Sequence, residues 1–358
     1  MYSQINPALT PAPNTVYLPT LLPAIEGMLR RGVTVERICA VFQRSLADIR
    51  APLVRVPMLM SRRFWDLAME HSADPGIGLA LGMDLLSRQP NGLSYLFDAE
   101  SSLKRGFDYL VRYSAQFQGH FRAEVVFRAD EVQVRLHDVG SLKAPPAVVD
   151  YVMAGLCALV RRKMLSCGHP GSPVRHVSFA HACVADPSRY VSALHTSVSW
   201  GQPWHALHFE RGLFVRDLTR RDAALVQRLQ ALVDDIDLRS RPSLLAEVCD
   251  QIAQDLCNGP TLEAFCNRRH MTRRTARRRL QAQGGQYSDL LDEYRRYRAG
   301  DLLQGSSLNL IEVTDLLGYR DLSSFSRAFG RWYGSSPGAW REGLTKTAGG
   351  VRSVQVHS

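Results

Sequence analysis

The stretch Arg268–Arg279, RRHMTRRTARRR, decides the interpretation of the C-terminal third of this chain of 358 residues. Seven of its twelve residues are arginine, and residues 264–288 contain no acidic side chain. Thr272 is well placed to cap a helix that follows it, and Ala276 and Leu280 would face inward on that helix. The neighbouring positions would then face outward, namely Arg273, Arg274, Arg277, Arg278 and Gln281.

The flanking sequence predicts that this helix is half of a helix–turn–helix unit. A short helix carrying Leu262, Phe265 and Cys266 precedes it, and residues 267–270 make the turn. A long helix is expected over Gln286–Gln304, followed by a second helix–Gly–helix pattern over Leu308–Tyr333. Arginine presents five donors that match phosphate oxygens and the guanine edge, and a helix fits the major groove. The pattern therefore predicts double-stranded DNA as a partner.

Three longer motifs resemble the DNA-binding domain of AraC/XylS-type transcription regulators. They read MTRRTARRRLQAQG from Met271, YSDLLDEYRRYRAGDLL from Tyr287 and DLLGYRDLSSFSRAFGRWYGSSPGAWR from Asp315. The resemblance covers Thr261 to Arg341, and it implies two recognition helices in successive major-groove segments. Carried over by motif position, it implies base contacts by Arg274, Arg277, Arg278, Ser323, Ser324 and Arg327, and phosphate contacts by Arg273 and Arg320.

Alternatives and departures accompany this interpretation. Each arginine could simply belong to a solvated helix face, and Ser323 or Ser324 could cap the second recognition helix, a role for which Asp321 competes. Arg269 and His270 stand where the family usually has an apolar residue and glycine, and Ala276 stands where leucine is usual. Gly300 lies inside the long helix, where glycine costs about 1 kcal/mol relative to alanine.

The region from residue 21 to residue 235 mixes helical and strand patterns. Residues 123–128 and 132–137 alternate in hydrophobicity, which indicates a hairpin. Residues 147–165 predict a buried helix, residues 174–180 and 206–210 predict strands, and Asp186 before Pro187 marks a helix start. We therefore expect an α+β N-terminal domain followed by an all-α C-terminal domain with two helix–turn–helix units joined by a long helix.

The N-terminal region resembles, more loosely, the arabinose-binding-like sensor domain of one AraC subgroup. The segments that carry this resemblance include GLSYLFDAESSLKRGFDYLVRYSAQF from Gly92 and PVRHVSFAHACVADPSRYVSALHTSVSW from Pro173. It implies ligand sensing and dimerisation without identifying a ligand. The candidates for an effector pocket are Tyr95, Tyr113, Phe117, His137, Trp200 and Trp204, and the alternative is that these side chains are core aromatics.

Composition and punctuation complete the domain assignment. The formal net charge is +10, which favours polyanionic partners. We expect a flexible arm at residues 1–20, a sensor and dimerisation domain at 21–235 and a linker at 236–242. The DNA-binding domain would occupy 243–342, with a disordered tail at 343–358. The longest apolar run has nine residues, too few to span a bilayer, and nothing before residue 20 suggests a signal peptide.

The sequence thus predicts a cytoplasmic, sequence-specific transcription regulator that is controlled by a small-molecule effector, acts as a homodimer and contacts RNA polymerase. We expect no catalytic activity, cofactor or metal. One alternative is a constitutive DNA-binding protein whose first domain only dimerises. The other is a thiol-dependent DNA-repair enzyme, for which Cys39, Cys157, Cys167 and Cys183 would have to gather. Seven scattered cysteines without a C-x-x-C pair favour reduced thiols.

Overall fold

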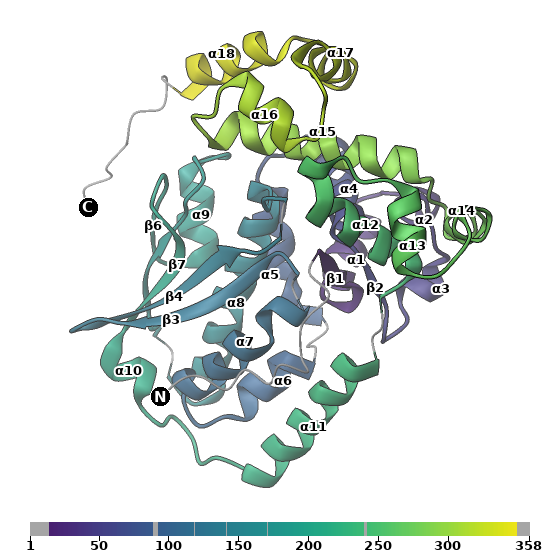
Figure 1. Ribbon diagram of the computed structural model, residues 1–358. Helices are drawn as coiled ribbons and strands as arrows, with labels where there is room; N and C mark the ends of the chain where they lie inside the picture. The colour runs from purple at the N-terminus through teal and green to yellow at the C-terminus, as the bar shows by residue number, and fades with distance from the viewer. Residues whose placement is uncertain are drawn as a thin grey trace. The chain divides into compact units, whose positions relative to one another are not determined.

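The computed structural model describes residues 14–88, 92–117, 119–140, 142–169, 171–239 and 242–348. The chain divides into two compact units, residues 1–246 and residues 247–358 (Figure 1). Unit 1 combines helices with two sheets, whereas unit 2 is helical throughout its described residues. The predicted fold class, an α+β domain followed by an all-α domain, is confirmed.

The larger sheet of unit 1 has five strands in the order β3-β4-β7-β5-β6. All neighbours are antiparallel except β5 and β6, which run parallel. The predicted hairpin is confirmed as β3 and β4, because Ala123 pairs with Leu136 and Val125 with Val134. The strands are β3 (Phe121–Phe127), β4 (Glu131–Asp138), β5 (Val174–Ser178), β6 (Ser197–Ser199) and β7 (His205–Glu210).

The two faces of this sheet differ in polarity because side chains alternate along each strand. Val132, Val134, Leu207 and Phe209 are buried on one face, against which α7, α8 and α10 pack. The other face carries polar side chains, among them Gln133, Arg135 and His208. The helices of unit 1 are α1 (Leu22–Arg30), α2 (Val35–Phe42), α3 (Leu46–Ile49), α4 (Met58–Ser72), α5 (Ile77–Arg88), α6 (Gly92–Ala99), α7 (Leu103–Phe117), α8 (Pro146–Ser166), α9 (Pro187–Leu194), α10 (Arg211–Val215) and α11 (Ala223–Arg239).

Two of the predicted boundaries differ from the structure. Residues 15–17 of the predicted arm form β1, which pairs with β2 (Arg55–Pro57), and residues 18–20 form a buried 3-10 turn. The prediction of a flexible arm is therefore wrong for residues 14–20, and residues 1–13 lie outside the described part. Helix α11 also continues to Arg239 through most of the predicted linker. The segment is rich in polar residues, but apolar residues recur along α11 at helical spacing and keep it helical.

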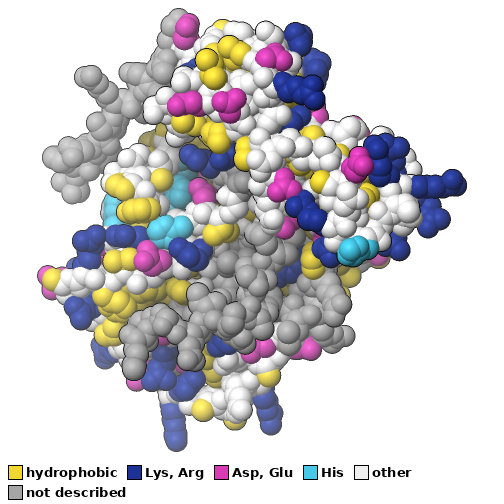
Figure 2. Space-filling view, in the orientation of Figure 1, with side chains coloured by type: hydrophobic (Ala, Val, Ile, Leu, Met, Phe, Trp, Pro, Cys, Tyr) yellow, Lys and Arg dark blue, Asp and Glu magenta, His cyan; other side chains and the backbone are white. Residues whose placement is uncertain are grey.

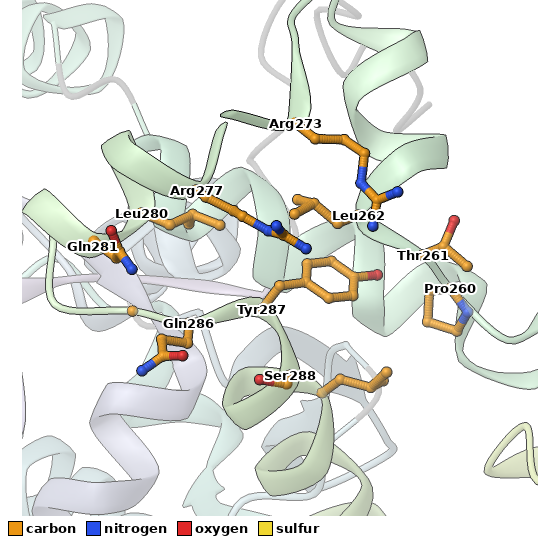
Figure 3. Close-up of a pocket in the computed structure, with 12 residues that line it drawn as sticks. Pro260, Thr261, Leu262, Arg273, Arg277, Leu280, Gln281, Gln286, Tyr287 and Ser288 are labelled. Atoms are coloured by element: carbon orange, nitrogen blue, oxygen red, sulfur yellow. The ribbon is translucent and has the colours of Figure 1, made fainter. Parts of the chain in front are cut away.

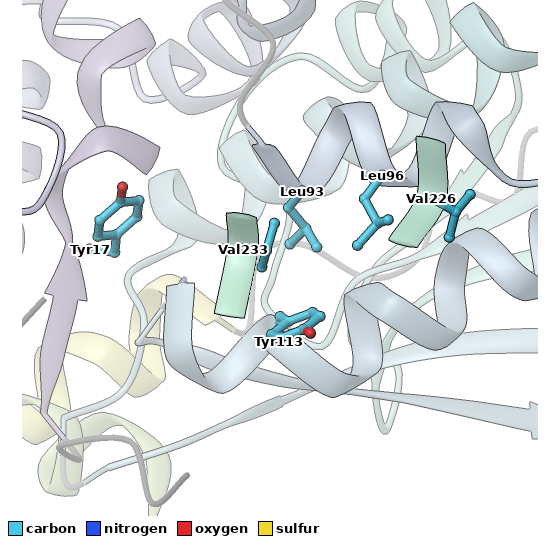
Figure 4. Close-up of a cluster of buried hydrophobic side chains, with 6 residues drawn as sticks. All are labelled: Tyr17, Leu93, Leu96, Tyr113, Val226 and Val233. Atoms are coloured by element: carbon cyan, nitrogen blue, oxygen red, sulfur yellow. The ribbon is translucent and has the colours of Figure 1, made fainter. Parts of the chain in front are cut away.

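Those apolar residues join α11 to the body of unit 1. Val226 and Val233 pack with Leu93 and Leu96 of α6 and with Tyr113 of α7, as Figure 4 shows. The Tyr113 hydroxyl donates a hydrogen bond to the Asp234 carboxylate at 2.5 Å. Tyr17 of β1 belongs to the same cluster, so this core ties both ends of unit 1 together.

Helices α5 and α8 approach each other unusually closely. A Cβ atom on Gly78 would lie 2.0 Å from the Ala147 carbonyl oxygen, and one on Gly82 would lie 2.5 Å from the Tyr151 carbonyl oxygen. Only glycine fits at such distances. Gly78 and Gly82 thus serve the packing of α5 against α8.

Unit 2 is a run of helices that follows the predicted order. Its first helix, α12 (Leu244–Asp255), begins shortly before the division between the units and ends in the 3-10 turn η2 (Leu256–Asn258). Part of the predicted tail is helical, because α18 extends to Ala348, and residues 349–358 are not described. The remaining helices are α13 (Leu262–Arg268), α14 (Arg273–Ala282), α15 (Tyr287–Gly305), α16 (Leu310–Leu316), α17 (Leu322–Tyr333) and α18 (Pro337–Ala348).

Candidate nucleic-acid interface and ligand site

Helices α13 and α14 form the first helix–turn–helix unit, and the predicted cap at Thr272 is confirmed. Thr261 accepts a hydrogen bond from the Ala264 amide at 3.1 Å, and Thr272 accepts one from the Thr275 amide at 3.2 Å. In the turn, His270 has a φ of 49°, in the left-handed region that favours glycine. The family's usual glycine at this position therefore has a clear conformational reason, and histidine here is strained.

The buried residues of α14 fix the directions of its arginines. Ala276 and Leu280 are buried at 0% and 1% exposure. With about 100° of rotation per residue, Arg278 lies roughly opposite this buried edge. Arg274, four residues earlier, points outward in nearly the same direction as Arg278. Arg277 lies about a quarter turn from the buried edge, on the side that faces the start of α15. Figure 3 shows its guanidinium extending toward Tyr287.

Ion pairs divide the seven arginines into two groups. Arg268 lies 2.5 Å from Asp255, Arg269 lies 3.0 Å from Glu247, and Arg273 lies 3.8 Å from Glu263. Across the described parts of the chain, no hydrogen bond or ion pair involves the side chains of the remaining four, Arg274, Arg277, Arg278 and Arg279. These four are exposed, and Figure 2 shows the basic side chains gathered over α14. Their charge is available to an external polyanion.

The second unit is formed by α16 and α17, and Asp321 caps its recognition helix. The Asp321 carboxylate accepts a hydrogen bond from the Ser324 amide at 2.7 Å and another from the Ser324 hydroxyl at 2.9 Å. Arg327 in turn donates to the Ser324 hydroxyl at 3.2 Å. Ser324 therefore takes part in the capping network without being the cap itself. Ser323 and Arg320 are exposed beside it.

The long helix α15 holds the second unit directly. Arg295 donates hydrogen bonds to the carbonyl oxygens of Leu317 and Gly318, both at 2.9 Å, and its guanidinium stacks over the Tyr319 ring. The Trp332 indole donates to Asp292 at 2.8 Å, so α17 is also fastened to α15. Figure 1 shows α14 beyond the start of α15 and α16–α18 packed along the rest of it.

The glycine inside α15 is explained by the same packing. A Cβ atom on Gly300 would lie 2.8 Å from the Tyr333 hydroxyl, which donates a hydrogen bond to the Arg296 carbonyl oxygen at 2.9 Å. Glycine lowers the helix propensity at position 300, but its missing side chain lets the Tyr333 hydroxyl reach the backbone of α15.

In unit 1, the structure does not gather the six predicted effector residues in one place. Tyr113 lies in the core cluster with α11, and Tyr95 is 50% exposed on α6. Trp200 packs against the rings of Phe179 and Tyr190. His137 and Trp204 do meet, with ring centres 5.2 Å apart. The side chain of Phe117 lies outside the described residues.

Trp204 also borders a hollow of about 280 Å³ on the polar face of the five-stranded sheet. Two histidines form its floor, with ring centres 5.2 Å apart. The His176 ring nitrogens lie 2.8 and 2.7 Å from the hydroxyls of Ser197 and Ser199. The lining residues are Arg128, Gln133, Arg135, His176, Ser178, Ser199, Gln202, Pro203, Trp204, Ala206 and His208.

The hollow is lined by cationic and hydrogen-bonding side chains, since Arg128 and Arg135 border it and none of the lining residues named above is acidic. His208 lies 2.9 Å from the Glu131 carboxylate and 2.9 Å from the Ser178 hydroxyl. Burial, and then the charge of His208, lowers the pKa of His176. Arg135 lies over the Trp204 ring, 5.4 Å from its centre. The hollow can therefore offer hydrogen-bond donors, acceptors and one aromatic face to a small polar molecule.

Of the residues that line this hollow, only Trp204 was among the predicted effector residues. The missed signal was alternation: Gln133, Arg135 and His137 share one strand face, and their register partners continue it on β7 and β5. Within the described residues, no three His, Cys, Asp or Glu side chains are grouped as metal ligands. Burial in α8 raises the pKa of the Cys157 thiol to about 12, which makes it a poor nucleophile.

Comparisons with known proteins identify both units. Residues 32–218 match the family model described as the arabinose-binding domain of AraC transcription regulator, and residues 265–343 match a helix-turn-helix domain. The first match alone covers more than half of the chain.

The chain belongs to the AraC family of transcription regulators.

Named relatives of this AraC-family regulator include the ornithine utilization regulator of Pseudomonas aeruginosa. That protein is 28% identical over 275 residues, which cover 75% of this chain and 79% of the relative. VirS of Mycobacterium tuberculosis is 31% identical over 180 residues, 49% of this chain and 52% of VirS. The solved structure of CdpR from Pseudomonas aeruginosa covers 86% of this chain and 96% of its own, with 19% identity and a TM-score of 0.39.

This protein is thus a DNA-binding, effector-controlled transcription regulator with an arabinose-binding-like N-terminal domain. No helix among its described residues is both long and apolar enough to cross a membrane.

Proposed function

We propose that this regulator reads its operator with α14 and α17 in successive major-groove segments. The observation that carries this proposal is the set of exposed, unpaired arginines on α14, opposite a buried edge. Among the residues assigned to bases, Arg274, Arg277, Arg278, Ser323, Ser324 and Arg327, the most outward directions on α14 belong to Arg274 and Arg278. Arg273 and Arg320 are proposed to bind phosphates. Ser324 would act mainly by positioning Arg327.

The site assignment is tested by comparing operator and random DNA. The operator is first found by genome-wide footprinting of the bound protein. Substituting a base-reading arginine should relax the sequence preference at particular base pairs. Substituting a phosphate-binding arginine should instead weaken binding to operator and to random DNA by the same factor. Equal losses on the two duplexes for every arginine of α14 would refute base reading by this helix.

We further propose that the effector binds in the hollow on the polar face of the sheet. Its size and hydrogen-bonding side chains favour a small polar molecule, and Trp204 would stack against the flat or apolar part of that molecule. Calorimetric titration against a metabolite panel should give a hit that Trp204→Leu weakens. Tyr95→Leu is the matched control, because Tyr95 is an exposed aromatic residue on α6 that does not line the hollow.

A homodimer that contacts RNA polymerase in the cytoplasm completes the proposal. Leu225 and Leu232 of α11 are 45% and 52% exposed and lie seven residues apart, so they share one helix face. Light scattering of Leu225→Glu and Leu232→Glu variants tests whether this face joins two copies. A dimer unaffected by both substitutions would place the interface elsewhere, and a wild-type monomer would reject dimerisation. A null result across the metabolite panel would favour the alternative of a DNA-binding protein that senses nothing.

A further inference from the structure

Unit 2 contains a second hollow, and this one borders the first recognition helix. It has a volume of about 500 Å³ and lies between the starts of α13 and α15 and one side of α14. Volumes of this order accommodate small organic ligands. Its apolar walls are Pro260, Leu262, Leu280 and Leu291, and its other lining residues are Thr261, Arg273, Arg277, Gln281, Gly285, Gln286, Tyr287 and Ser288.

Two arginine side chains of α14 line this hollow. Arg273 and Arg277 are four residues apart on α14, so both reach the same side of the helix. Figure 3 shows their guanidinium groups and the Tyr287 ring directed toward one another from α14 and α15. Arg277 has no hydrogen bond or ion pair in the described structure, and Glu263 lies 3.8 Å from Arg273. The hollow therefore carries positive charge beside an apolar surface.

Tyr287 contributes the face of its ring to this hollow. Its hydroxyl oxygen is buried and inaccessible to solvent, so a ligand in the hollow would meet the ring and not the hydroxyl. The ring lies beside the Arg277 guanidinium, so an aromatic surface and a cation border the same space.

We propose that this hollow binds a small organic anion with a flat apolar body. The anionic group would accept hydrogen bonds from Arg277 and Arg273, and the body would lie against Leu262, Leu280 and the Tyr287 ring. The complementarity is one of charge and polarity, because two guanidinium groups face an anion and an apolar wall faces its flat body. This site is distinct from the effector hollow of unit 1, and it goes beyond the function proposed above.

Occupancy of the hollow would act directly on DNA binding. The same two arginines are proposed to contact DNA, and a guanidinium engaged by a bound anion is no longer available to a phosphate or a base. The anion and DNA therefore compete, and by linkage each weakens the other. This second part of the inference rests on the proposed DNA interface, whereas binding of the anion does not.

The test uses the full chain with naphthalene-2-carboxylate as the probe and naphthalene-2-carboxamide as its neutral control. Binding is measured calorimetrically without DNA. We expect saturable binding of the carboxylate, at least tenfold tighter than that of the carboxamide. Arg277→Gln should weaken it about tenfold, as expected for one lost charge-assisted hydrogen bond. Arg278→Gln removes the same charge one residue away, outside the lining, and should change binding by less than about twofold.

Each outcome decides one part of the inference. No saturable binding, equal binding of carboxamide and carboxylate, or equal losses in the two arginine variants would overturn the site. Tyr287→Leu provides a second variant, since it removes the aromatic ring against which the flat body lies and should also weaken binding of the probe. If the probe binds as expected, titrating DNA in its presence should raise the apparent Kd for DNA. An unchanged Kd would overturn the competition, and absence of DNA binding altogether would overturn the proposed function while leaving the site intact.

Discussion

Replacing Arg295 with methionine tests whether the spacer helix α15 keeps the second helix–turn–helix unit in shape. The Arg295 side chain donates to the carbonyl oxygens of Leu317 and Gly318 at 2.9 Å each. Its guanidinium carbon lies 4.4 Å from the centre of the Tyr319 ring. Methionine retains the apolar stem but loses all three interactions and leaves two carbonyl groups of the turn without this donor.

The expected magnitude follows from these contacts. A hydrogen bond from a charged donor contributes about 1.5–3 kcal/mol, and a partly exposed cation–π contact contributes about 0.5–1 kcal/mol. Arg295 is only partly buried and water can reach the freed carbonyl groups, so the lower values apply, and they sum to about 3.5 kcal/mol. A loss of this size should lower the melting temperature of unit 2 by about 10–15 °C.

Scanning calorimetry of the full chain, with amide hydrogen exchange across residues 314–322, measures the effect. Arg298→Met is the matched control, since Arg298 lies on the same helix and its side chain makes no hydrogen bond or ion pair in the described structure. Arg295→Lys should recover less than half of the loss, because an ammonium group cannot reproduce the forked geometry. Equal melting temperatures for the Arg295→Met and Arg298→Met variants would refute the reasoning.

Three further predictions follow from other parts of the chain. Arg278→Gln should reduce the binding free energy on the operator by about 1–3 kcal/mol and on random DNA by much less. Arg320→Gln should weaken binding to both duplexes and reduce the slope of log K against log salt concentration by about 1, as gel-shift titrations would show. Burial lowers the pKa of His120 to about 3. The unfolded chain therefore takes up a proton near pH 6.5 that the folded chain refuses, and stability should fall on acidification by up to about 1.4 kcal/mol per pH unit. His120→Gln should flatten that slope in urea titrations between pH 7 and pH 5, and an unchanged slope would count against burial of this ring. Gly78→Ala should destabilise unit 1 by more than about 2 kcal/mol, because the new Cβ atom would lie 2.0 Å from a carbonyl oxygen of α8. The matched change Gly330→Ala meets nothing within 4 Å and should stabilise α17 by up to about 1 kcal/mol, so similar effects in chemical denaturation would contradict the assigned packing.

Local patterns were sufficient for much of the fold. The caps at Thr272 and Asp186 were predictable because a side-chain oxygen before a helix satisfies amides of its first turn. The hairpin of β3 and β4 was predictable because both strands alternate. These signals depend on neighbours within a few residues, so one sequence suffices to read them.

Features that depend on distant partners could not be read in this way. Residues 15–17 look like part of a mobile arm until they pair with residues 55–57. The insertion of β7 between β4 and β5 brings His208 beside His176, and no local pattern encodes that neighbourhood. On α14, the spacing of the arginines predicted an outward-facing surface. That Arg277 borders a hollow depends on the placement of Tyr287 of α15, which the spacing does not encode.

The turn at Gly318 has a consequence for how the chain entering unit 2 can act on DNA. Gly318 has a φ of 67°, and a Cβ atom there would lie 2.1 Å from the Leu256 carbonyl oxygen in η2. The backbone that follows α12 thus packs against the turn of the second helix–turn–helix unit, although the first unit comes next in sequence. Because Arg268 and Arg269 at the end of α13 also pair with Asp255 and Glu247 of α12, a displacement of α12 would reach both helix–turn–helix units together.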